Sequence, residues 1–256
     1  MKPSKKMHYL VLAALISFTF NSCELFQSSV QIEFEHFWDE ERIGPGNLNI
    51  TEFVTESGET IIIDDIHYII SEIQLKRQGR NEIYTLSEFQ FAKHLNRWFV
   101  SISDIPHDDY EITFVFGLRP ELNVQNSNLN LPDSFQVPQE LGGGYNFMQL
   151  DGRYEDSMNE LQPFEFHISS AVDISNPNNV QIENTSFEVS LGTHFLSGGP
   201  FLSAVDVKVN IAEWFRNPNT WNFSELNSDL TTNYDAQIQM QENGQAVFTL
   251  STVYSD

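Results

Sequence analysis

Alternating apolar and polar positions predict that most of this chain forms β-strands. Side chains on a strand point to opposite faces in turn, so an alternating run has one face for the core and one for solvent. Such runs, or strand-like apolar segments, occur at 31–38, 66–75, 98–102, 110–116, 164–168, 187–191 and 205–211. Turn-forming Gly, Pro, Asn and Asp separate them. Many short strands with frequent turns indicate an all-β fold, a single antiparallel β-sandwich.

Helical signal is sparse in the same pattern. Ser224–Leu230 and Tyr234–Glu242 are each compatible with a short helix, the second ended by Asn243-Gly244. Glu121–Gly144 is polar and rich in Asn and Pro, which is typical of a long loop, and long loops in compact domains often carry function. Without an internal repeat or a second core, we expect one domain over residues 31–256, with long loops and one or two short helices.

The first 22 residues read as a secretion signal. Three lysines precede a short apolar run, and Asn21-Ser22 leads into Cys23, the only cysteine of the chain. This pattern resembles the bacterial lipoprotein signal, which predicts cleavage before Cys23, lipidation of Cys23 with palmitate incorporation, and a tether over residues 23–30. The alternative is an ordinary signal peptide followed by an unrelated cysteine.

The net charge of −23 excludes some classes of partner. Nucleic acids need clustered Lys and Arg, and anionic lipid surfaces need them too. Membrane attachment therefore rests on the lipid at Cys23. The acidity itself is compatible with simple solubility or with a field that attracts cations.

The chain lacks the common enzyme motifs, and no nucleophile or acid–base pair can be placed, so we do not expect an enzyme. Histidines are the remaining candidates for chemistry. His36 lies on the apolar face of its strand, where a metal or a backbone carbonyl can satisfy the imidazole. His167 lies opposite the apolar Phe166 face and is either a ligand or a solvent-facing residue.

Three consecutive glycines, Gly142 to Gly144, precede the strand-like run Tyr145–Leu150. Glycine permits backbone conformations and close approaches that other residues cannot adopt. Two readings stay open: the glycines bring backbone close to a ligand or metal, or they form a tight entry into the strand.

The order of several short motifs resembles that of the MbnP-like lipoproteins, which are common in Bacteroidota. The matching stretches are Phe34–His36, Ile66–Leu75, Ile105–Leu118, Gly143–Gly152, Phe164–His167, Val207–Asn219 and Tyr234–Leu250. The resemblance covers most of the mature chain. It implies an all-β domain of the periplasm or outer membrane and, in characterised relatives, copper binding by histidines with an oxidised tryptophan.

Carried over motif by motif, the resemblance makes His36 and His167 the candidate metal ligands. It also implies a dihaem peroxidase-like protein or a TonB-dependent transporter as partner. The chain departs from the pattern at Val137-Pro138, where relatives often have a tryptophan, and at Asn146, where some have a histidine.

Two functions follow from these observations. The first is a lipid-anchored extracytoplasmic binding protein, in the outer membrane with its domain on the periplasmic or surface side, that holds copper or another transition metal through His36 and His167. The alternative is a metal-free module that recognises a peptide, glycan or protein through the Glu121–Gly144 loop.

Overall fold

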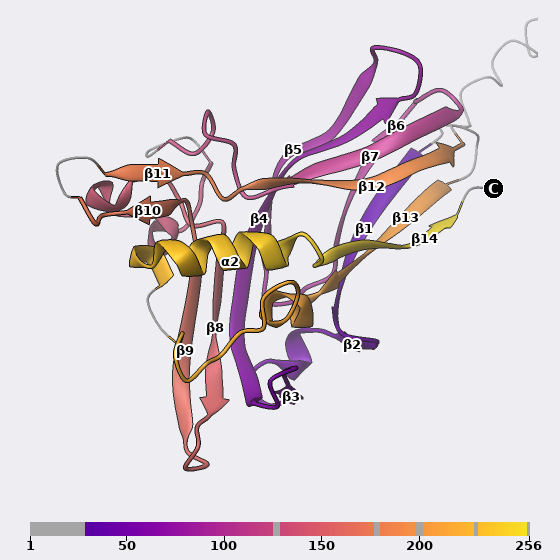
Figure 1. Ribbon diagram of the computed structural model, residues 1–256. Helices are drawn as coiled ribbons and strands as arrows, with labels where there is room; N and C mark the ends of the chain where they lie inside the picture. The colour runs from indigo at the N-terminus through magenta and orange to yellow at the C-terminus, as the bar shows by residue number, and fades with distance from the viewer. Residues whose placement is uncertain (1–28, 125–128, 177–179, 198–201, 228–229, 255–256) are drawn as a thin grey trace, which may run out of the picture.

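Two β-sheets pack face to face in the computed structural model, which describes residues 29–124, 129–176, 180–197, 202–227 and 230–254 (Figure 1). The predicted signal segment 1–22 and Cys23 lie outside the described residues. The prediction of an all-β sandwich is confirmed. Among the described residues, no helix has the length and apolarity needed to cross a bilayer.

The first sheet has five strands and is built around β1 (Ser29–Trp38). β1 pairs with β13 (Leu202–Asn210) on one edge, and β14 (Phe248–Tyr254) follows β13. On its other edge β1 pairs first with β6 (Trp98–Ser103) and then with β2 (Glu41–Ile43). The β1–β13 pair is parallel, whereas the other pairs of this sheet are antiparallel.

The second sheet has seven strands and is organised by the 18-residue strand β4 (Thr60–Arg77). The first half of β4 pairs with β8 (Met148–Glu155), and its second half pairs with β7 (Asp108–Phe116). The opposite edge pairs with β3 (Glu52–Val54) and β5 (Ile83–Lys93). A single long strand therefore holds four neighbours in register.

The remaining strands extend this sheet or stand beside it. They are β9 (Leu161–Ile168) on β8, β12 (Phe187–Leu196) on β7, and the small hairpin of β10 (Ala171–Asp173) and β11 (Gln181–Glu183). Short 3-10 turns complete the chain at Pro45–Asn47, Asp133–Phe135, Gln139–Leu141, Ile211–Phe215 and Leu230–Thr232.

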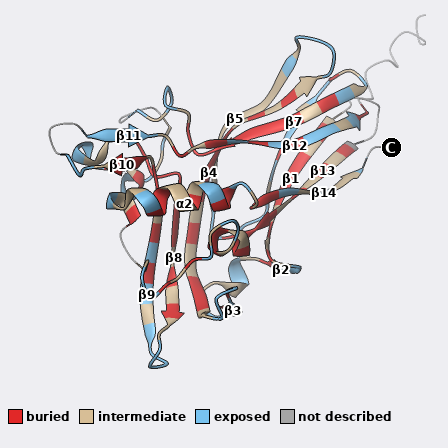
Figure 2. Cartoon of the chain, in the orientation of Figure 1, coloured by how far each residue is buried: buried red, intermediate tan, exposed pale blue. Residues whose placement is uncertain are grey.

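Buried residues lie along the central strands of both sheets (Figure 2), and many of the core side chains are aromatic. Phe34 of β1 stacks on Trp98 at 3.9 Å between ring centroids and meets Phe114 of the other sheet edge-on at 5.4 Å. Tyr68 of β4 faces Phe248 of β14 across the same gap. Alternation along each strand thus places one set of side chains in a shared core and leaves the other set outside.

The helix prediction holds for the second of its two segments. The helix α2 (Tyr234–Gly244) begins at Asn233, whose side chain accepts a hydrogen bond from the Ala236 amide at 3.1 Å. Among the described residues of 224–230, Ser224 and Glu225 lie in a turn and Leu230 begins the 3-10 turn Leu230–Thr232, so these residues are not α-helical. The described residues of Glu121–Gly144 form the expected loop, which contains the two short 3-10 turns at Asp133–Phe135 and Gln139–Leu141.

The structure supports the interpretation of Gly142 to Gly144 as a tight entry into the following strand. Gly144 has a φ of +77°, and a Cβ there would lie 2.8 Å from the backbone oxygen of Asn123. The next amide, of Tyr145, donates to Asn123 Oδ1 at 2.8 Å. The backbone is therefore drawn against Asn123, at the base of the long loop, and β8 starts at Met148.

Candidate metal centre

A cluster of polar groups lies on the outer face of the second sheet. Along β4, Tyr68 is buried in the core, so its neighbour His67 points to the opposite side. Asp65 lies two residues earlier and shares the outer face with His67. His94 follows β5 directly, and β5 pairs with β4 so that Lys93 lies opposite His67. This hairpin brings together residues that are 27 positions apart.

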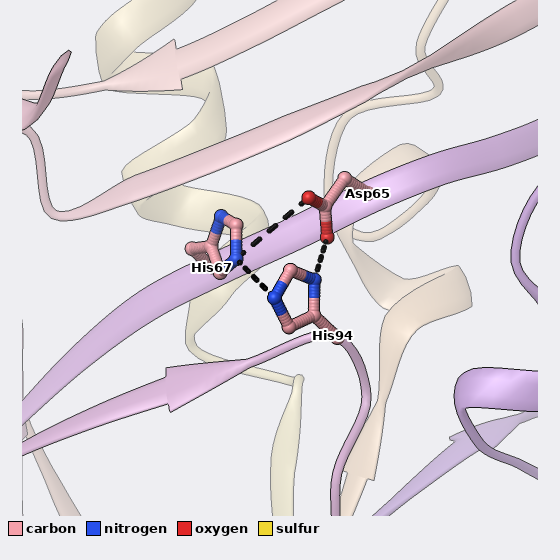
Figure 3. Close-up of side chains that lie close together, drawn as sticks. All are labelled: Asp65, His67 and His94. Carbon is pink, nitrogen blue, oxygen red and sulfur yellow. Dashed lines mark hydrogen bonds and ion pairs between the residues drawn. The ribbon is translucent and has the colours of Figure 1, made fainter.

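Asp65, His67 and His94 form a compact set of metal-binding atoms (Figure 3). His94 Nδ1 lies 2.7 Å from Asp65 Oδ1, and His67 Nε2 lies 3.3 Å from His94 Nε2. His67 Nε2 is also 3.7 Å from Asp65 Oδ2. One ligand atom from each residue falls within 4.8 Å of the others. We call these three residues the triad.

An unusual backbone conformation holds His94 in the triad. His94 and Leu95 have φ values of 53° and 55°, in the left-handed region that ordinary side chains rarely adopt. The His94 amide donates to Ile66 O at 2.8 Å, and the Leu95 side chain is buried in the core. Two neighbouring interactions therefore fix the turn. Such strained residues often occur at functional sites.

The long loop forms one wall of the site. Phe135 lies in the loop, is buried, and meets Phe91 of β5 edge-on with 4.9 Å between centroids. Its ring also lies 6.3 Å from that of His67. Beside it, Gln149 Nε2 donates to Ser134 O at 2.7 Å. The loop that the sequence marked as a functional candidate therefore covers one side of His67.

The electrostatics of the triad favour neutral imidazole at His67. Partial burial lowers the pKa of His67, and the nearby His94 and Lys93 lower it further, while Asp65 and Asp151 oppose the shift. A metal ligand must present an unprotonated nitrogen, so this environment suits metal binding. Two imidazoles and one carboxylate are donors that transition metals accept.

A second histidine–carboxylate pair lies on the same outer face. Strand register places Asp65 opposite Asp151 of β8, and Asp151 opposite Glu165 of β9. In the neighbouring row, Gln149 separates His67 from His167. His167 Nε2 lies 3.1 Å from Asp151 Oδ1. The predicted residue His167 is therefore on the face of the triad, one strand removed from it.

His36, the other predicted ligand, lies in the core. Its Nε2 shares a hydrogen bond of 2.8 Å with the Tyr68 hydroxyl, and its Nδ1 lies by the backbone of Leu95 without a well-aligned partner. Burial lowers its pKa to about 4. Because Tyr68 faces inward and His167 outward, the second sheet stands between the two predicted ligands. They do not share one metal site in this structure, although each remains a prediction as a single ligand.

Neither His67 nor His94 is among the ligands predicted from the sequence, which are His36 and His167. One local signal for His67 was present, because Asp65 and His67 alternate with Ile66 and Tyr68 on a strand. His94 had no local signal, since only the β4–β5 pairing brings it to His67. None of the four tryptophans belongs to the triad. Trp38, Trp214 and Trp221 are buried in the core, and Trp98 stacks on Phe34.

Comparison with known proteins gives a consistent assignment. The family model described as MbnP matches residues 27–240. Among solved structures, MbnP from Methylosinus trichosporium has a similar fold, with a TM-score of 0.52 at 9% sequence identity, covering 88% of this chain and 98% of that chain. No match was found among curated proteins. Because the family model spans most of the sequence, the chain belongs to the MbnP family.

Proposed function

We propose that this MbnP-family protein is a binding protein, not an enzyme, and that it holds a transition metal, copper first, at Asp65, His67 and His94. The observation that carries the proposal is the convergence of three ligand atoms within 4.8 Å of one another. The histidines come from two hydrogen-bonded strands and a fixed turn, so the ligands are held before any ion arrives.

The hydrogen bonds of the triad are compatible with this role. If His94 Nδ1 donates to Asp65, then His94 Nε2 accepts, and His67 Nε2 must donate to it. The proton between the two Nε2 atoms holds the rings together in the metal-free protein. An ion that takes the place of this proton between the two Nε2 atoms needs little rearrangement of the side chains, because the proton can move to His67 Nδ1 and both imidazoles stay neutral.

Copper is the first candidate because the MbnP resemblance implies it and because imidazole accepts copper. The cellular location of the protein is proposed from the lipoprotein-like signal at its N-terminus. We propose that Cys23 is lipidated and holds the domain at the outer membrane, on its periplasmic or surface side. A dihaem peroxidase-like protein or a TonB-dependent transporter is the partner that the resemblance implies.

Metal titration of the full chain in detergent tests this function. We expect bound Cu²⁺ and a higher melting temperature for the wild type, since a ligand that binds only the folded state stabilises it. The triple variant Asp65→Asn, His67→Gln, His94→Gln should lose both effects. His194→Gln is the matched control, because His194 bonds to Leu191 O on β12. Absence of metal and of any thermal shift in the wild type would reject the proposal.

A metal-free interaction module remains the second candidate. It is favoured by one observation, the buried Val137 with Pro138 at the place where relatives often carry a tryptophan. This function would use the Glu121–Gly144 loop to recognise a peptide, glycan or protein. A loop deletion that leaves every captured partner unchanged would count against it.

A further inference from the structure

We propose that the triad selects a divalent ion, Cu²⁺ or Zn²⁺, over Cu⁺, and that Asp65 is the residue that sets this preference. This inference rests on the proposed metal-binding function and deepens it, because it names the charge class of the ion. It follows from the chemistry of the donors and from the charges that surround them.

The donor set contains no sulfur. Cu⁺ is a soft ion that thiolate and thioether ligands select, whereas carboxylate oxygens suit harder ions. Among the described residues, Met148 and Met240 are buried in the core and Met158 lies in the exposed β8–β9 turn. Met148 precedes Gln149 on β8 and therefore faces inward, away from the triad. The Asp65 carboxylate takes the third position instead.

The surrounding charge also favours a doubly charged ion. Asp65, Asp151 and Glu165 are direct neighbours across three strands, and like charges placed opposite one another destabilise a sheet. A cation at the triad relieves the repulsion between Asp65 and Asp151. At equal distance and dielectric, each carboxylate attracts a divalent ion twice as strongly as a monovalent one.

The basic side chains nearby offset the negative charge of Asp65, Asp151 and Glu165 only in part. Lys93 Nζ lies over the Phe91 ring at 4.8 Å from its centroid, and Arg153 is bound to Asp64 through a hydrogen bond of 2.6 Å. His167 contacts Asp151 and is the other titratable partner on this face.

Competition titrations test the preference directly. The full chain in detergent is titrated with Cu²⁺ and Zn²⁺, and under anaerobic conditions with Cu⁺ against a cuprous chelator. Wild type should bind both divalent ions, and Cu²⁺ in preference to Cu⁺. Asp65→Asn should weaken Cu²⁺ and Zn²⁺ about tenfold or more but change Cu⁺ binding little, because the neutral amide removes charge and retains shape.

His94→Gln provides the matched comparison, since loss of an imidazole should weaken both oxidation states of copper. Tighter binding of Cu⁺ than of Cu²⁺, or equal losses of both ions in Asp65→Asn, would overturn this inference and leave the metal site intact. If wild type binds no ion of either charge, the proposed function itself fails. Circular dichroism of each metal-free variant confirms that a loss reflects the ligand and not the fold.

Discussion

The Nε2 atoms of His67 and His94 lie 3.3 Å apart, although one residue belongs to a strand and the other to the turn that follows its neighbouring strand. Two imidazolium rings at that distance would repel each other, so at least one ring stays neutral. The pair is therefore prepared for an electrophile, either a shared proton or a metal ion.

His36 should make stability depend on pH. Its folded pKa of about 4 lies below its ordinary value of 6.5, so the unfolded chain binds more protons between these values. The contribution of neutral His36 to the free energy of unfolding is fully present above pH 6.5 and is lost as the pH falls toward 4. Wild type should lose about 3 kcal/mol more than His36→Gln between pH 7 and pH 4. Urea unfolding at both pH values measures this, and equal losses in both proteins would contradict it.

Phe135→Ala should destabilise the domain and open the wall beside His67. The Phe135 ring is buried against Phe91, so its removal should cost about 3 kcal/mol of unfolding free energy. Copper affinity should fall as well, because solvent gains access to His67. Phe195→Ala on β12 is the control, since that ring is 55% exposed and should change stability by less than about 0.5 kcal/mol. Matching effects at both positions would show that the loop does not pack as described.

Gly152→Ala should destabilise the pairing of β8. A Cβ at Gly152 would overlap the backbone oxygen of Ile62 and the ring of Phe164, so strands must shift to admit it. We expect a loss of about 2 kcal/mol. Gly46→Ala is the matched control, because no atom lies within 4 Å of the added methyl. Differential scanning calorimetry of both variants would decide, and an unchanged melting temperature in Gly152→Ala would refute the close approach.

Cys23→Ser should release the protein from membranes and abolish palmitate incorporation, because the thiol is the lipid acceptor in the predicted signal. Fractionation of cells labelled with palmitate measures both effects. A variant that stays in the membrane fraction, together with a wild type that takes up no label, would contradict lipidation.

Local pattern predicted much of this fold because alternation is a local property. Ile32, Phe34 and Trp38 mark the buried face of β1, and the structure buries all three. The parallel partnership of β1 with β13 was not predicted, since residues about 170 positions apart meet there. Strand periodicity says which face is buried but not which strand lies beside it.

The same limit explains the outcome for the metal site. His36 stood out because a histidine on an apolar face is conspicuous, and the core position was correct. The triad depends on pairing, because His94 reaches His67 only through the β4–β5 hairpin. Predicting it requires strand register, which the alternation of Asp65 and His67 alone does not supply.

The position of β1 has a consequence for orientation at the membrane. Ser29 follows Cys23 by six residues, so a lipid at Cys23 would hold the start of β1 within about 20 Å of the bilayer. His36 lies seven residues further along β1, roughly 23 Å away, and the Leu95 backbone is beside it. His94 of the triad is next to Leu95 in the chain. The segment between Cys23 and Ser29 would therefore attach at one end of the sandwich, and the triad would lie toward the other end. An anchored molecule would thus hold the triad on the side of the domain that faces away from the bilayer.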